Sequence, residues 1–508
     1  MKMVNSVMNP KRWLRIALPM LIISAILACV FLRPPRPEPT TESSSATLDQ
    51  DRAFDRLLDI LREESAQRRT WRYPSEEQIR AMRARIADFA ALDKAALAPP
   101  RQEAYDLLRC EFSLYEDSLK FFYYEEPFGP EGMHIALAAG LCRAGFGGEI
   151  DVREYLQSCR AIAGELDDMI AFEREKAARG LFITGAASEA TAQWCEGFVD
   201  LNNKNPLITT FNERIEILQF PKEHETYYKE ENKAVYYDFI VPAYERAAEA
   251  LRELARTYGG KTKGLRELPE GREYADYRLR RLGLNHVGQT VALDRALLQR
   301  EERLKTLEKQ DLVLPMLKKT DAKKLFKQIS EAASEDFPPL PRGVKVTILP
   351  MEDMEERASY GGYYVVPGPR NYKNNYIFYN PDISADKLFS VIAHEGIPGH
   401  LLATTQGLAS DMPDYCKTLH YLGFVEGWAK YAEYYAYRYL EGDAAAIEYR
   451  RLNSEFGMLL SARLELGVHV DGWGPARIKE YIRGFFPDYG PQGEAFDGFW
   501  DNYISLRR

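Results

Sequence analysis

The sequence HEGIPGH at His394–His400, together with FVEGWAKYAE at Phe424–Glu433, predicts helices that carry a metal site. Zinc in proteins is bound by imidazole nitrogen and carboxylate oxygen, and a catalytic site uses three protein ligands because its fourth position is kept for water. The two histidines of the first motif and Glu426 of the second provide these donors, so we expect them to bind one Zn²⁺ ion. Glu395 directly follows the first histidine and is the expected general base for that water.

The spacing of the two histidines requires a break in the helix. In the common helical zinc motif H-E-x-x-H, the two ligands are one turn apart, but here the fourth position after His394 is Pro398. In an uninterrupted helix, at about 100° per residue, His400 would point roughly 240° away from His394. Pro398 lacks an N–H and disfavours helical backbone before it, so the helix should end near Gly396 and Ile397. A Pro-Gly turn can then bring His400 back beside His394.

Both motifs have an alternative structural interpretation. The first is also compatible with a helix end that carries two incidental histidines, although the whole chain has only 7 histidines. The second is also compatible with an ordinary amphipathic helix. In that case Glu426, Lys430 and Glu433 would face solvent, and the aromatic residues Phe424, Trp428, Tyr431 and Tyr435 would face the core.

A third motif, RLELGVHVDGW at Arg463–Trp473, completes a family resemblance. With the other two motifs it resembles the bacterial family of domain of unknown function 885 (DUF885). That family is similar to helical zinc peptidases of the gluzincin type, in which the third ligand is a glutamate on a later helix. The resemblance is strong from about Gly343 to Trp473. It implies one zinc ion bound by His394, His400 and Glu426, with Glu395 as the general base.

The chain departs from the family pattern close to the first motif. The family usually has a second histidine and then Leu-Gln, whereas this chain has Leu401, Leu402 and Ala403, which leaves His400 as the second ligand. Glu465 stands where the family tends to have aspartate. A Pro-Gly-Gln block near the C-terminus reads FPDYGPQGEAF here. The departures are compatible with altered activity or an unusual substrate.

Several further residues are candidates for the site. Amide hydrolysis passes through an oxyanion, which a hydrogen-bond donor stabilises, and His469 or Tyr364 could supply that donor. Tyr363 and Arg463 are candidates for substrate binding, Arg463 because a guanidinium binds carboxylate in bidentate fashion. Each residue also has a structural alternative. His469 could be a core histidine, the two tyrosines could serve packing alone, and Arg463 could form a structural ion pair.

The remaining sequence predicts a mainly α fold, a large two-lobed helical body like that of metallopeptidases with a small antiparallel β-sheet beside the metal-binding helix. Long charged runs carry apolar residues at three- and four-residue spacing. Short aromatic or β-branched segments at 344–350, 360–366 and 374–380 predict strands, and a helix should follow from Ser384 to about Gly396. The sheet edge could pair with an extended peptide, or the sheet could simply cover the helix.

The N-terminal residues predict attachment to a membrane. Residues 1–32 combine basic residues with an apolar run, as in a signal sequence or an uncleaved anchor. The sequence ILAC resembles a lipoprotein cleavage box in which Cys29 would carry the lipid, whereas the apolar residues after it favour a single membrane span. Residues 33–50 predict a flexible linker. Residues 51–508 would form the hydrolase domain, with a lobe boundary near 260–272, on the extracytoplasmic face.

Composition narrows the function. The 508-residue chain has a formal net charge of -9 and no basic stripe with interleaved aromatics, so nucleic acid is not an expected partner. No Gly-x-Ser-x-Gly motif is present, which disfavours acyl-enzyme chemistry. We therefore expect a zinc metallopeptidase that acts on peptides. The alternatives are a zinc amidohydrolase acting on a cell-wall amide and a surface binding protein without catalysis. Oligomeric state stays open.

Overall fold

The computed structural model describes residues 45–67, 71–129, 132–142, 144–259, 264–284, 288–313, 321–351, 361–419 and 421–487. The predicted anchor at 1–32, including Cys29, and most of the predicted linker at 33–50 lie outside these residues. None of the helices in the described ranges is long and apolar enough to cross a membrane.

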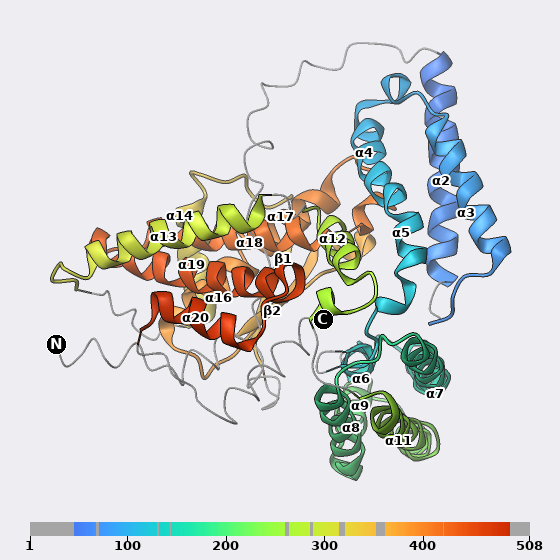
Figure 1. Cartoon of the computed structure of the whole chain (residues 1–508). Coiled ribbons are helices and arrows are strands. Elements are labelled where there is room, and N and C mark those ends of the chain that lie inside the picture. The colour runs from blue at the N-terminus through green and yellow to red at the C-terminus, as the bar shows by residue number, and fades with distance from the viewer. Residues whose placement is uncertain are drawn as a thin grey trace. The chain divides into compact units, whose positions relative to one another are not determined.

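The fold is mainly helical, as predicted (Figure 1). The chain first forms α2 to α14, then a small sheet, and then α16 to α20. The helices up to the sheet are α2 (Ser45–Gln67), α3 (Glu76–Ala90), α4 (Pro99–Ser113), α5 (Tyr115–Lys120), α6 (Met133–Cys142), α7 (Glu149–Ala178), α8 (Gly185–Asp200), α9 (Pro206–Ile217), α10 (Lys222–Val235), α11 (Val241–Tyr258), α12 (Gly271–Arg281), α13 (Gln289–Leu307) and α14 (Ala322–Ala333). The strands and later helices are β1 (Lys345–Pro350), β2 (Gly362–Val365), β3 (Asn374–Tyr379), α16 (Ala385–Glu395), α17 (His400–Ala409), α18 (Leu422–Ala436), α19 (Ala444–Leu466) and α20 (Pro475–Phe485).

Helix α2 covers the last residues of the range predicted as linker. It begins at Ser45, whereas the linker was expected to continue to about Gln50. No proline or glycine occurs between Ser45 and the apolar residues of α2, so nothing in the sequence stops the helix from extending toward the N-terminus.

The chain divides into two compact units, each made of segments far apart in the sequence. Among the described residues, the first unit comprises those from 45 to 65, Arg80–Tyr115 and Asp276–Leu466. The second comprises Ala66–Ile79, Glu116–Ala275 and residues 467–487. The predicted lobe boundary at 260–272 lies just before one of the crossings between them. The two candidate metal motifs both belong to the first unit.

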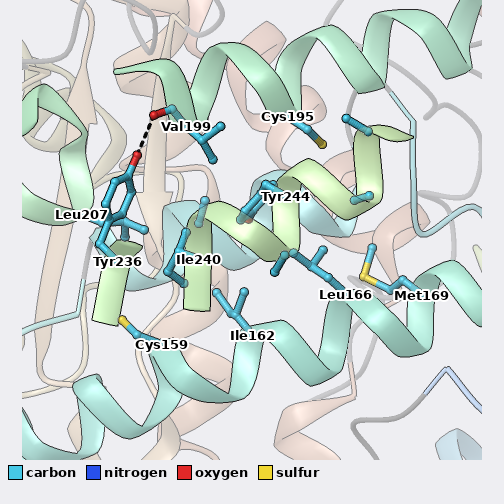
Figure 2. Packing of buried hydrophobic residues seen from close by; sticks show 14 of the residues in the cluster. Cys159, Ile162, Leu166, Met169, Cys195, Val199, Leu207, Tyr236, Ile240 and Tyr244 are labelled. Carbon is cyan, nitrogen blue, oxygen red and sulfur yellow. Dashed lines mark hydrogen bonds between the residues drawn. The ribbon is translucent and has the colours of Figure 1, made fainter. Parts of the chain in front are cut away.

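The second unit is built around α7, α8 and α11, which pack side by side (Figure 1). Apolar side chains repeat along one face of each helix, so the three faces meet in a core. Leu166 and Tyr244 are fully buried there, and the Tyr236 hydroxyl donates a 2.9 Å hydrogen bond to the backbone carbonyl of Val199 (Figure 2). This bond satisfies the only polar group of the buried Tyr236 side chain.

In the first unit, long helices support the part of the chain that carries the motifs. Helix α13 packs along α19, and α16 packs against both α14 and α18. Ion pairs such as Arg300 with Glu455, at 2.7 Å, join α13 to α19. A separate apolar cluster joins α2, α3 and α4, where Phe54 and Leu108 are almost completely buried.

The sheet has the strand order β1-β3-β2. Strands β2 and β3 are antiparallel, but β1 and β3 are parallel, so the sheet is mixed and the prediction of an antiparallel sheet was wrong in this respect. The Pro-Gly-Pro segment after Val366 makes the β2–β3 hairpin evident in the sequence. The longer connection between β1 and β2 permits either direction for β1, and the alternating pattern of a strand carries no information on its direction.

The sheet lies tightly against α16, the helix predicted to bind metal. Ile348, Tyr364 and Ile377 share an apolar cluster with residues of α16. A Cβ atom on Gly362 would lie 2.3 Å from Cγ1 of Val391 on α16, so only glycine permits this approach of β2.

Candidate metal centre

Helix α16 presents its last turn to the site. Ser384 caps its N-terminus by accepting a 3.3 Å hydrogen bond from the Lys387 N–H. Leu388 and Ile392, which are one turn apart, lie on the buried face of the helix. The helix ends at Glu395, at the position that the proline predicted.

A tight turn then returns the chain to the first histidine. The Gly399 N–H donates to the carbonyl of Ala393 at 3.1 Å, and helix α17 begins at His400. A Cβ on Gly399 would lie 1.8 Å from the carbonyl oxygen of His394, so the turn requires glycine here. The rings of His394 and His400 are perpendicular, with centroids 4.7 Å apart. The predicted bend that brings the two imidazoles together is therefore confirmed.

Helix α18 supplies the third candidate ligand and secures the turn. Glu426 lies near its N-terminal end, and Trp428 follows two positions later. The indole N–H of Trp428 donates a 2.9 Å hydrogen bond to the carbonyl of Pro398. Because Pro398 is two residues before His400, this bond links the helix that carries Glu426 to the turn that carries His400.

The three predicted ligands form a cluster of the size that zinc requires. One donor atom from each of His394, His400 and Glu426 lies within 4.8 Å of the others. The Glu426 carboxylate lies between the rings, 3.4 Å from Nε2 of His394 and 3.5 Å from Nε2 of His400. A tetrahedral site with bonds of about 2.1 Å has edges of about 3.4 Å. The donor set and its spacing therefore fit a zinc ion.

The environment of the cluster is partly open. The side chains of His394 and His400 are 10% and 12% exposed, while that of Glu426 is 39% exposed. Solvent can thus reach the cluster from the side of Glu426.

Glu395 lies between the cluster and the sheet. Its Oε2 accepts a 3.0 Å hydrogen bond from the backbone N–H of Tyr364 on β2. Burial raises the pKa of Glu395, while the nearby His394 and His400 oppose that shift. A carboxylate with a raised pKa beside a candidate metal site is suited to accept and return a proton.

A second layer of charged residues lies behind His394. Oε2 of Glu433 is 3.3 Å from Nδ1 of His394, and the Lys430 ammonium donates a 2.6 Å hydrogen bond to the same oxygen. Lys430 and Glu433 are both buried. The outward-facing residues include the aromatic Phe424 and Tyr431, at 48% and 39% exposure. The interpretation of this helix as an ordinary amphipathic one with a solvated acidic face was therefore wrong.

The spacing of the second layer groups its residues on one helix face but does not by itself reveal their burial. Lys430 and Glu433 follow Glu426 by four and seven residues, which places all three on one helix face. A face that holds a metal ligand is turned toward the interior, so its other members are buried as well. The sequence alone does not show which of the two opposite faces is the inner one.

The charges in the cluster are strongly coupled. Burial alone would lower the pKa of His394, but the nearby carboxylates of Glu426 and Glu433 outweigh it and raise the pKa to about 9. Burial opposes ionisation of Glu426, yet its contacts with His394 and His400 hold its pKa well below the usual range. The protein without metal thus keeps a proton on His394 and a negative charge on Glu426.

The two predicted tyrosines are near the site but differ in their contacts. The Tyr364 hydroxyl donates a 2.6 Å hydrogen bond to Oδ1 of Asn375, so it is the backbone of Tyr364 that contacts Glu395. Burial raises the pKa of that hydroxyl. The Tyr363 ring stacks on Phe378, with centroids 5.1 Å apart. The roles predicted for their side chains in catalysis and substrate binding stay predictions.

Arg463 and His469 have structural partners. The buried Arg463 donates from Nε to Asp294 of α13 at 2.8 Å, which is the ion pair considered as its alternative. His469 belongs to the second unit, where its Nδ1 accepts a 3.1 Å hydrogen bond from the Leu265 N–H. A neutral imidazole whose Nδ1 accepts carries its proton on Nε2, so the predicted role of His469 as a donor stays a prediction.

Comparison with known proteins places the chain in a family. A family model described as "Bacterial protein of unknown function (DUF885)" matches residues 68–308 and 295–487, well over half of the chain. The chain belongs to this family. In this DUF885 protein, the position where the family usually has a second histidine is Leu401, which is completely buried in the apolar cluster beside α16.

One solved structure shows that the fold of this DUF885 protein extends across nearly the whole chain. It is described as a "putative lipoprotein" from Colwellia psychrerythraea, and it superposes with a TM-score of 0.70 at 15% sequence identity. The alignment covers 91% of this chain and 90% of that chain. No curated protein matches the chain.

Proposed function

We propose that this protein is a zinc-dependent peptidase of the extracytoplasmic face of the cell. The observation that carries the proposal is the cluster of His394, His400 and Glu426, whose donor atoms lie within 4.8 Å of one another. These residues would hold one zinc ion. The ion would polarise the scissile carbonyl and lower the pKa of a water molecule.

Glu395 would move the proton in this reaction. Its Oε2 is held by the Tyr364 N–H, which fixes the direction of the carboxylate and leaves Oε1 to accept a proton from water. Its raised pKa favours return of that proton to the leaving amine. Removal of this base typically slows such reactions by about a hundredfold to ten-thousandfold.

The sheet supports a peptide as the substrate. Strand β2 is an outer strand in the order β1-β3-β2, and its Tyr364 contacts Glu395. An extended peptide that paired with β2 would pass alongside the base, with main-chain hydrogen bonds fixing its register. Tyr363 and the exposed Val365 belong to the same strand and would contact its side chains.

The N-terminal sequence supports an extracytoplasmic location. The ILAC box at Cys29 and the description of the structural neighbour as a lipoprotein agree with lipid attachment of this chain at Cys29. The alternative is a single membrane span formed by the same apolar run.

The test combines metal analysis with hydrolysis. The purified full chain is expected to contain one zinc ion and to cleave peptides from a mixed library, and a chelator should abolish cleavage until zinc is restored. Cleavage of cell-wall amides but not peptides would replace the peptidase with an amidohydrolase. Stoichiometric zinc without cleavage of either substrate class would contradict the proposal and favour a binding protein.

A further inference from the structure

We propose that Lys430 sets the metal affinity of the site by drawing the carboxylate of Glu433 away from His394. This inference rests on the zinc site proposed above. It assigns a positioning role to a buried lysine that neither binds the metal nor reaches the scissile bond.

Lys430 is buried within the first unit. Its side chain is 11% exposed, and its ammonium lies 2.6 Å from Oε2 of Glu433 and 5.7 Å from the centroid of the Tyr434 ring. Lysine is among the residues least often found buried, and it is buried almost only when it is paired. An apolar side chain would fill this place on α18 at lower cost, so the charge itself needs an explanation.

The oxygen that binds Lys430 is also the one that faces the metal ligand. Oε2 of Glu433 lies 3.3 Å from Nδ1 of His394, farther than its 2.6 Å contact with Lys430. A carboxylate bonded to the outer nitrogen of a ligand histidine makes that histidine a stronger donor to the metal. Because Lys430 binds the same oxygen at shorter range, it weakens the attraction between that carboxylate and His394, and thus the donor strength of the ligand.

The two members of the pair should therefore have opposite effects on zinc binding. Glu433→Gln removes the negative charge behind His394 and should weaken zinc binding by about tenfold to a hundredfold. Lys430→Met leaves Glu433 to His394 alone and should tighten zinc binding, by about tenfold on the same scale. A pair that only held α18 in place would weaken zinc binding, or leave it unchanged, in both variants.

The double variant tests whether Lys430 acts through Glu433. With Gln at 433 there is no charge for Lys430 to draw away, so Lys430→Met should change zinc affinity by less than about threefold in the Glu433→Gln background. Equal tightening in both backgrounds would show direct repulsion between the lysine and the metal, and would overturn the proposed route.

Lys417 provides a matched control. Its side chain is 12% exposed and its ammonium binds Asp414 at 3.2 Å, three positions away, as Lys430 binds Glu433. Lys417→Met should leave zinc affinity unchanged. If Lys430→Met does not fold, Lys430→Gln removes the charge and keeps a hydrogen-bond donor.

The experiment measures the zinc affinity of each full-length variant by competition with a chelating dye, and the visible absorption of each variant loaded with Co²⁺. Tighter zinc in Lys430→Met, weaker zinc in Glu433→Gln and shifted cobalt bands in both support the proposal. Weaker or unchanged zinc affinity in Lys430→Met overturns it. A wild-type protein that binds no zinc would instead refute the proposed function, so the two failures are distinguishable.

Discussion

The hydrogen bond from Trp428 to Pro398 should hold the second ligand in place. In Trp428→Phe the indole N–H is lost, and the buried carbonyl of Pro398 loses its partner at 2.9 Å. An unsatisfied buried carbonyl costs about 1–2 kcal/mol. If the bond orders the turn before His400, its loss makes the free energy of zinc binding less favourable by this amount, which lowers the zinc affinity by about fivefold to thirtyfold.

The assay is zinc competition at constant pH, together with unfolding of the protein without metal. Tyr431→Phe is the matched control for the loss of a polar group, because its ring lies 6.0 Å from that of Trp428 and is partly exposed. Phe337→Leu is the control for packing, because Phe337 contacts the Trp428 ring edge-on at 6.1 Å. Neither control should change zinc affinity by more than about threefold. Wild-type zinc affinity in Trp428→Phe would refute the claim that this bond positions His400.

Further predictions concern the base, the ligands and the second unit. Glu395→Gln should retain zinc and lose at least about a hundredfold in turnover; an active Glu395→Gln protein would refute the assigned base. Since the pKa of His394 is raised to about 9, zinc must displace a proton from it, so the zinc affinity measured by calorimetry at several pH values should fall about tenfold per pH unit between pH 8 and pH 6; a flat profile would contradict this coupling. Burial lowers the pKa of His134 to about 4, below that of the unfolded chain, so stability is lost as pH falls below about 6.5. His134→Leu should remove about 2 kcal/mol of the stability loss between pH 7 and pH 5, measured by denaturant unfolding; equal losses in both proteins would show that His134 is protonated in the fold.

The helices and the bend at the metal site could be predicted because they depend on local sequence. The rule that proline ends a helix operates within one turn, and it placed the end of α16 beside Glu395. The apolar period likewise predicted the mainly helical fold that the structure shows. Glu426 was predicted as a candidate ligand from its residue type and the resemblance to the family, and the structure brings it between the two imidazoles.

Features that depend on distant partners could not be predicted. The Nδ1 atom of His469 is bound by the N–H of Leu265, which lies 204 residues earlier, and no pattern within either segment indicates that contact. The burial of Lys430 and Glu433 depends on which side of α18 faces α16, and aromatic residues on the opposite side made the other orientation equally plausible. The direction of β1 was open because its connection to β2 is long.

Diffraction from zinc-soaked crystals at the zinc absorption edge tests the central claim most directly. The account predicts one anomalous peak in the first unit, at about 2.0–2.2 Å from Nε2 of His394, Nε2 of His400 and a carboxylate oxygen of Glu426. A peak bound by other residues, or no peak at this cluster when zinc is present in excess, would contradict it.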